Sequence, residues 1–212
     1  MEPAFWHERW AAGQTGFHQQ RVHPALEVHE DAFLGGEPTR VLVPLCGKSW
    51  DLDWLARRGH EVVGVELSER AVAQFHDEHD RTPTVSQEGP FTAWRSENLT
   101  VLVGDLFDLP ERVSDRPFDR VWDRASMVAL PPALRSRYTD VVRRVAEGGR
   151  LLLSTFRYDP SVMSGPPFSI DPSEVQGAYP TAQLVETDDT VPPPFAARGH
   201  RRFEQRLWMV EL

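Results

Sequence analysis

Two hydrophobic periods alternate along this chain of 212 residues, one typical of strands and the other of helices. Continuous apolar runs predict seven strands, at 40–45, 61–66, 99–103, 118–122, 150–156, 183–190 and 205–211. Apolar residues at helical spacing and capping signals predict helices, at 3–12, 49–58, 68–79, 131–145 and directly after Asp171. Because strands and helices alternate through the first five strands, we expect a mostly parallel sheet with helices on both faces.

No helical segment separates the last two predicted strands, so we expect these two to pair antiparallel. The sequence thus predicts an α/β protein with a doubly wound, mostly parallel, seven-stranded sheet and an antiparallel last strand, which is a Rossmann-like layout. The sequence contains no internal repeats and no glycine–serine linker. A chain of this length fits one hydrophobic core, so residues 1–212 are expected to form a single domain.

Composition narrows the function classes. The formal net charge is −9, so the chain lacks the basic surface that attracts nucleic acid or an anionic membrane, and we expect neither partner. The one cysteine, Cys46, excludes an internal disulfide and favours a reducing compartment. The sequence has no apolar run of about 18 residues that would span a bilayer and no apolar signal region near its start. We therefore expect a soluble cytoplasmic protein.

The turn after the first predicted strand is a candidate ligand site, because doubly wound sheets bind ligands beyond the carboxyl ends of their strands. Gly47-Lys48-Ser49 matches the end of the phosphate-loop motif, but Leu42 stands where that motif needs its first glycine. The dinucleotide pattern G-x-G-x-x-G is also absent. The turn therefore predicts neither a nucleoside triphosphate site nor a pyrophosphate site.

Glu66 follows Gly47 by 19 residues and closes the second predicted strand. A carboxylate at this place can accept hydrogen bonds from both hydroxyls of a ribose. The alternative is that Glu66 only caps the helix predicted after Ser68. A charged residue at the end of so apolar a strand needs a partner, which favours a nucleoside ligand.

Further short blocks follow one another over nearly the whole chain. They are Phe5-Trp6 with Trp10, Gly16-Phe17-His18-Gln19, Val43-Pro44-Leu45-Cys46-Gly47-Lys48-Ser49, Gly59-His60, Gly64-Val65-Glu66-Leu67-Ser68, Gly104-Asp105-Leu106-Phe107, Asp123-Arg124-Ala125, Ala129-Leu130-Pro131, and Tyr158 with Gly165-Pro166-Pro167-Phe168. In this order and spacing they resemble the thiopurine S-methyltransferase family in its shorter bacterial form. The five predicted parallel strands with an antiparallel strand at the end also resemble S-adenosylmethionine-dependent methyltransferases.

The resemblance implies a class I methyltransferase fold and S-adenosyl-L-methionine as the methyl donor, with S-adenosyl-L-homocysteine as the product. It also implies which residues bind the cofactor, namely Trp10, Leu45, Gly47, Glu66, Leu106 and Arg124. Of these, Leu45 and Gly47 would line the methionine side, Glu66 would hold the ribose and Leu106 would lie near the adenine. Phe17 would form an aromatic wall of the acceptor site, which Arg124 would also face.

Methyl transfer from a sulfonium is an in-line displacement that needs positioning and exclusion of water more than acid–base groups. Residues 1–36 carry Phe5, Trp6, Trp10 and Phe17, so this segment has the composition of a lid over the site. The alternative is that these aromatics only fix a helix to the core. Thiols ionise near neutral pH, so we expect no catalytic base. Arg124 would stabilise an anionic acceptor, unless it forms a structural ion pair with Asp123 or Asp105.

Three other patterns give weaker indications of function. His76 and His79 share a helical face in an acidic run that is typical of a solvated surface, and no third ligand indicates a metal. Cys46 precedes a predicted helix and suits either a nucleophile of lowered pKa or a packing role, which we favour. Pro192–Pro194 would stiffen a loop near the active site or bind an aromatic groove of a partner.

We therefore expect a monomeric enzyme that methylates the sulfur of thiopurines or other aromatic and heterocyclic thiols. The alternative acceptors are halide, thiocyanate, sulfide, selenium and tellurium species, since a soft acceptor needs only an apolar pocket and an in-line approach. A third possibility is a module that binds the cofactor without turnover. The sequence departs from the family pattern at Trp50 and in the proline-rich stretch 187–198, so the acceptor is the least transferable inference.

Overall fold

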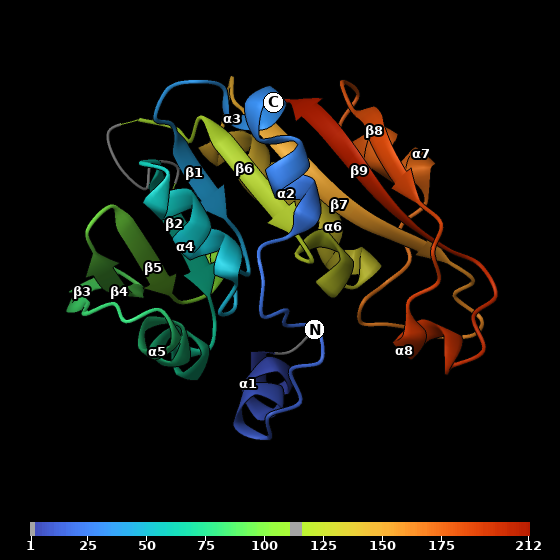
Figure 1. Ribbon diagram of the computed structural model, residues 1–212, viewed down its shortest axis with the longest axis horizontal. Coiled ribbons are helices and arrows are strands. Elements are labelled where there is room, and N and C mark those ends of the chain that lie inside the picture. The colour runs from blue at the N-terminus through green and yellow to red at the C-terminus, as the bar shows by residue number, and fades with distance from the viewer. Residues whose placement is uncertain (1–2, 111–115) are drawn as a thin grey trace.

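A single mixed sheet organises the protein, and Figure 1 shows it with helices on both faces. The computed structural model describes residues 3–110 and 116–212. In this part of the chain the sheet has nine strands in the order β3-β4-β5-β2-β1-β6-β7-β9-β8. The strands are β1 Arg40–Val43, β2 Glu61–Glu66, β3 Thr84–Glu88, β4 Phe91–Ser96, β5 Leu99–Val103, β6 Arg120–Arg124, β7 Arg150–Tyr158, β8 Gln183–Asp188 and β9 Phe203–Glu211.

The five strands in the middle of the sheet run parallel, as the alternation of strand and helix predicts. Strand β1 pairs with β2 on one side and β6 on the other, and β5 and β7 extend the parallel set. All four residues of β1 are buried, which explains why this strand reads as a continuous apolar run. The carboxyl ends of β1, β2, β5 and β6 therefore meet at one edge of the sheet.

The prediction of seven strands is wrong in number, because it omits the antiparallel hairpin β3–β4. Every residue of β3 is exposed, so this edge strand has no apolar face that a sequence pattern could reveal. In β4 only Phe91, Ala93 and Ser96 are buried. The expected antiparallel pairing of the last two strands is confirmed: β9 pairs antiparallel with both β7 and β8.

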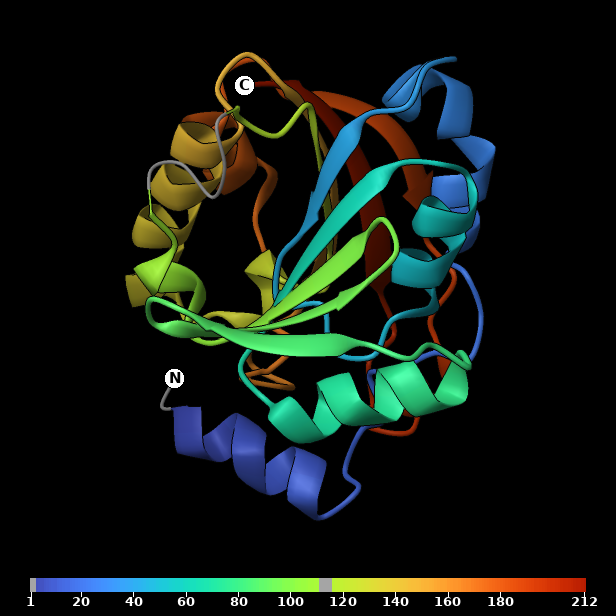
Figure 2. The same ribbon diagram turned by 90° about the vertical axis from the view of Figure 1, so that its left-hand side faces the viewer.

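Two hydrophobic clusters fill the space between the sheet and its helices. Helices α4 Trp50–Arg57 and α5 Glu69–Glu78 bury their apolar residues in the cluster on one face, as do the short helices α2 Pro24–Val28 and α3 Glu30–Leu34. On the other face lie α6 Pro132–Val145 and α7 Pro172–Ala178. Figure 2 shows these two layers with the sheet between them. The remaining short helices are η1 Leu106–Asp108, η2 Met127–Ala129 and α8 Pro193–Ala196.

Three of the predicted helix starts are confirmed by their caps. The hydroxyls of Ser49 and Ser68 accept from the amides of Asp51 and Ala71, and the Asp171 carboxylate accepts from the amide of Ser173. Helices α2 and α3, which have five residues each, were not predicted from the sequence. The proline-rich stretch was predicted to be a loop, but α8 begins there at Pro193.

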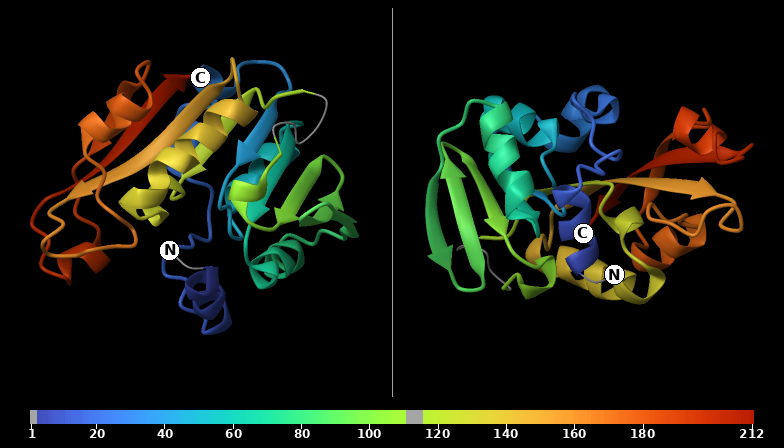
Figure 3. Two further views of the ribbon diagram at one scale, coloured as in Figure 1. Left: turned by 180° about the vertical axis from the view of Figure 1, so that it is seen from behind. Right: turned by 90° about the horizontal axis from the view of Figure 1, so that it is seen from below.

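The N-terminal helix α1, Pro3–Ala11, lies apart from both layers. It sits beyond the edge where the parallel strands end and contacts α5 (Figures 1 and 3). The chain then runs along this edge to α2. Among the described residues, no helix is long and apolar enough to cross a membrane.

Candidate active site

The turn between β1 and α4 has a backbone shape that a single glycine makes possible. Leu45 and Gly47 have φ angles of 45° and 55°, in the left-handed region that favours glycine. A Cβ atom at Gly47 would lie 3.1 Å from Cζ2 of Trp10, so the ring of Trp10 packs directly on this turn. The amide of Cys46 donates to the carbonyl of Val65, which fixes the turn beside the end of β2. The turn and the N-terminal segment are thus fitted to each other.

Glu66 joins this turn to the start of α5. Its Oε2 accepts from the amide of Gly47 at 2.9 Å, and its Oε1 accepts from the amide of Ser68 at 2.8 Å. The residue is only 7% exposed. Burial raises the pKa of the carboxyl above its ordinary value, while these two amides and, more weakly, the amide of Leu67 act in the opposite direction. Glu66 therefore supports the helix start, as the alternative interpretation held, and each oxygen keeps a lone pair for another donor.

Phe17 is the centre of the aromatic cluster on the N-terminal segment. Its ring centroid lies 5.6 Å from that of Trp10 and 5.8 Å from that of Trp6, both edge to face. Phe5 extends the cluster through Trp6. Trp10 is buried at 4% exposure, whereas Phe17 keeps 37% exposure. Trp10 is therefore a fixed support, and Phe17 presents an aromatic surface at the edge of the sheet.

Arg124 is the last residue of β6 and is partly buried. Its Nη2 donates to the carbonyl of Phe17 at 3.4 Å, which ties the N-terminal segment to the end of β6. Burial lowers the pKa of the guanidinium and the carboxylate of Asp51 counteracts this effect. The alternative, an ion pair with Asp123 or Asp105, is wrong: Arg124 pairs with neither, and both carboxylates bind elsewhere among the described residues.

The side chain of Asp123 points to the face of the sheet that α6 covers. Its carboxylate accepts from the hydroxyl of Tyr138 at 2.6 Å and from the amides of Ser126 and Met127. Burial raises its pKa to about 6, and these three donors oppose that shift. The side chain therefore fixes the chain after β6, next to Arg124, from inside the core.

Leu106 lies in η1, directly after β5. Asp105 caps this turn by accepting from the amide of Phe107 at 2.9 Å. The side chain of Leu106 is 1% exposed and belongs to the core on the α6 face. The amide of Gly104 donates to the carbonyl of Glu66, so η1 begins beside the carboxylate at the end of β2.

Sequence reasoning missed Asp51, which is 1% exposed. Its Oδ1 accepts from the amide of His23, and its Oδ2 accepts from Nε1 of Trp122, both at 2.8 Å. This one carboxylate therefore joins α4, the N-terminal segment and β6. The sequence holds no signal for such partners, which lie 28 and 71 residues away along the chain.

The histidine run on α5 is not the solvated surface that its sequence indicates. His76 and His79 are buried, at 2% and 8% exposure. Nδ1 of His76 lies 2.9 Å from the carbonyl of Val72, and Nδ1 of His79 lies 3.6 Å from the carboxylate of Asp53. Burial lowers the pKa of both rings. These side chains pack the α4–α5 layer.

Cys46 packs against the sheet. A Cβ atom at Gly64 would lie 2.7 Å from its sulfur, and burial raises the pKa of the thiol well above its ordinary value. The packing interpretation is therefore confirmed, because a nucleophilic cysteine needs a lowered pKa.

Comparison with solved structures identifies the fold. The 1,6-didemethyltoxoflavin-N1-methyltransferase of Burkholderia thailandensis, solved with S-adenosylhomocysteine, matches with a TM-score of 0.67 at 16% identity, covering 99% of this chain and 87% of the other. Magnesium protoporphyrin IX methyltransferase of Synechocystis PCC 6803 matches with a TM-score of 0.64 at 12% identity over 100% of both chains. The fold is that of the class I S-adenosylmethionine-dependent methyltransferases.

Sequence relatives identify the family. A model of the thiopurine S-methyltransferase family matches residues 1–212. Thiopurine S-methyltransferase of Pseudomonas fluorescens (strain Pf0-1) is 42% identical over 215 residues, which covers 99% of both chains. The enzyme of the same name from Bordetella petrii is 42% identical over 217 residues, covering 100% of this chain and 99% of the other. The chain belongs to the thiopurine S-methyltransferase family and is an S-adenosylmethionine-dependent methyltransferase.

Proposed function

We propose that this protein transfers the methyl group of S-adenosylmethionine to the sulfur of thiopurines or of other aromatic and heterocyclic thiols. The observation that carries the proposal is the convergence of Glu66, Gly47, Trp10, Arg124 and Phe17 at the carboxyl edge of the sheet. This edge is where doubly wound sheets bind nucleoside ligands.

The residues at this edge fit the cofactor. Glu66 keeps a lone pair on each oxygen after binding its two amides, and these accept the hydroxyls of the ribose. Leu45 and Gly47 line the methionine side of the site, and Trp10 packs against it. Leu106 serves through its main chain near the adenine, because its side chain is buried in the core.

The bound cofactor supplies a methyl group on a sulfonium, and the protein orients the acceptor toward it. Phe17 forms an aromatic wall for the acceptor ring and, with Trp6 and Trp10, excludes water. Arg124, held to Phe17 by a hydrogen bond, faces the acceptor and stabilises its thiolate. No general base is assigned, because thiols ionise near neutral pH and heteroaromatic thiols are more acidic still.

The proposal extends to the organisation of the protein. Residues 1–212 form one methyltransferase domain, and residues 1–36 act as a lid over the active site. The enzyme works as a cytoplasmic monomer on small molecules and has no nucleic-acid partner. The net charge of −9 and the single cysteine support this environment.

The experiment that tests the function measures S-adenosylhomocysteine formation with 6-mercaptopurine, beside iodide, thiocyanate and selenite as acceptors. We expect turnover on 6-mercaptopurine. Turnover on the inorganic acceptors alone would show that the enzyme methylates soft anions instead of thiols. Cofactor binding without product on any acceptor would reject catalysis of this kind.

A further inference from the structure

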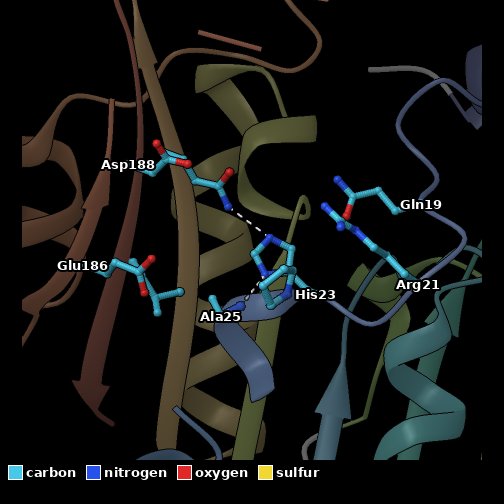
Figure 4. Close-up of a pocket in the computed structure, with 9 residues that line it drawn as sticks. Gln19, Arg21, His23, Ala25, Glu186 and Asp188 are labelled. Carbon is cyan, nitrogen blue, oxygen red and sulfur yellow. Dashed lines mark hydrogen bonds between the residues drawn. The ribbon is translucent and has the colours of Figure 1, made fainter. Parts of the chain in front are cut away.

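A cavity of about 180 Å³ lies between the N-terminal segment and the edge of the sheet that β9 and β8 form. Figure 4 shows Gln19 and Arg21 on one side of it, Glu186 and Asp188 on the other, and His23 between them. The remaining lining residues include Gln205 of β9. Drug-sized pockets span roughly 300–1,000 Å³, so this cavity fits one ring system and not a whole nucleoside.

The cavity adjoins the acceptor end of the proposed active site. Arg124 pairs with Ser154 across β6 and β7, so both lie at the same level of the sheet. The hydroxyl of Ser154 accepts from Nε2 of Gln205 at 3.2 Å, and Gln205 lines the cavity. Gln19 follows Phe17 by two residues along the segment that Arg124 holds. An acceptor lying against Phe17 therefore has this cavity beside it.

The floor of the cavity is preorganised. His23 is buried, and its Nε2 lies 3.0 Å from Nε2 of Gln205 (Figure 4). Burial lowers the pKa of His23 to about 4, so its ring is neutral at physiological pH. The amide of His23 is held by Asp51. Neither His23 nor Gln205 supplies a charge, and both are fixed by their own contacts.

The walls carry opposite charges with spare hydrogen-bonding capacity. In the described part of the chain, the side chains of Arg21 and Gln19 make no hydrogen bond or ion pair. Glu186 is held by Nε2 of His29 at 2.8 Å. Asp188 accepts from the Thr190 amide at 2.9 Å, within its own loop. Hydrogen bonds from the side chain and the amide of Thr190 lower the pKa of Asp188, so its carboxylate is anionic at neutral pH. An anionic Asp188 and a cationic Arg21 thus line opposite sides of a ring-sized space.

We propose that this cavity recognises the nitrogen-bearing edge of the acceptor ring, with Asp188 accepting from a ring N–H and Arg21 donating to a ring nitrogen. 6-Mercaptopurine offers both groups on one small ring system, whereas a simple aryl thiol offers neither. Hydrogen bonds to charged groups are the stronger kind and fix orientation. The inference rests on the proposed function and adds that the cavity selects heterocyclic over carbocyclic thiols.

The test compares 6-mercaptopurine with thiophenol, which has the same nucleophile and no ring nitrogen. We would measure KM and kcat for both acceptors, and the equilibrium binding of 6-mercaptopurine to protein loaded with S-adenosylhomocysteine. The variants are Asp188→Asn, which keeps an oxygen for the Thr190 amide, and Arg21→Gln. Asp189→Asn is the matched control, because its exposed side chain does not line the cavity.

We expect Asp188→Asn to raise both KM and the dissociation constant for 6-mercaptopurine about tenfold. Arg21→Gln acts in the same direction, and thiophenol kinetics stay within about twofold of wild type. Equal effects on both acceptors, or 6-mercaptopurine binding no weaker than in Asp189→Asn, would overturn the recognition role. If wild type methylated neither thiol, the proposed function would fail. The equilibrium binding of 6-mercaptopurine would still decide the role of the cavity.

Discussion

Glu66 supports the fold through two amides, and we propose that the same side chain also binds the ligand. It binds the amides of Gly47 and Ser68 from inside the core and still has lone pairs free for a ribose. Glu66 could be predicted from the sequence as a candidate site residue because it stands at the end of a buried strand. The two interpretations of Glu66, helix support and ligand binding, are therefore compatible.

Replacing Glu66 by Gln tests this double role. The variant loses the charge and one acceptor, and hydrogen bonds to charged groups are worth about 1.5–3 kcal/mol. We expect S-adenosylhomocysteine affinity, measured by titration calorimetry, to fall by at least about tenfold. Glu69→Gln, at an exposed position of α5, is the control. Unchanged affinity in Glu66→Gln would remove this residue from the cofactor site.

The raised pKa of Asp123 predicts that the stability of the protein depends on pH. Its folded pKa, about 6, lies above its ordinary value of 3.8, so its contribution to stability is complete below pH 3.8. That contribution is lost as the pH rises through 6. We expect the free energy of unfolding of wild type, relative to Asp123→Asn, to fall by about 2–3 kcal/mol between pH 4 and pH 7. Denaturant unfolding at pH 4 and pH 7 measures it. A difference that is constant with pH would contradict the assignment.

At the scale of elements, the site depends on contacts between segments that are distant in sequence. Asp51 of α4 binds the N-terminal segment at His23 and strand β6 at Trp122. Arg124, two residues beyond Trp122, then binds the same segment at Phe17. Two polar links therefore hold the segment that carries Phe17 against the end of β6.

Asp51→Ala would leave the amide of His23 and Nε1 of Trp122 buried without an acceptor. Each unsatisfied buried group costs about 1–3 kcal/mol, so we expect the variant to lose about 2–4 kcal/mol of stability. Asp51→Asn keeps one acceptor oxygen and should lose less. Thermal and denaturant unfolding of the three proteins provide the measurement. A loss below 1 kcal/mol in Asp51→Ala would show that water replaces both bonds.

Phe17→Ala tests the acceptor wall on the same segment. The exposed face of this ring is the part available to an acceptor. We expect KM for 6-mercaptopurine to rise about tenfold, with S-adenosylhomocysteine affinity within about twofold of wild type. Phe5→Ala, at the outer end of the same aromatic cluster, is the control. If cofactor affinity collapsed instead, Phe17 would belong to the donor site.

For the molecule as a whole, hydrophobic period predicted the parallel strands and the longer helices, and it missed an exposed hairpin and two short helices. The five parallel strands and the caps Ser49, Ser68 and Asp171 were visible because burial and capping leave local patterns. The hairpin β3–β4 was not, because every side chain of β3 is exposed. The short helices α2 and α3 are below the length at which a helical period can be recognised.

The residues of the candidate site also divide into those that the sequence predicts and those that only the fold reveals. Gly47 and Glu66 were predictable from strand ends, and Trp10, Phe17 and Arg124 came from a family resemblance that local physics could not replace. The partners of Asp51 and the cavity lined by Arg21 and Asp188 depend on segments more than 25 residues apart that only the fold brings together. Strand alternation and local caps hold no information about such pairs.

In the proposed function, this edge of the sheet transfers a methyl group from a sulfonium to a thiol sulfur. The most direct measurement uses S-adenosylmethionine with a ¹³C-labelled methyl group and 6-mercaptopurine, and locates the label in the product by NMR. We expect an S-methyl carbon and one S-adenosylhomocysteine for each product molecule. A label on a ring nitrogen, or no labelled product from protein that binds the cofactor, would contradict it.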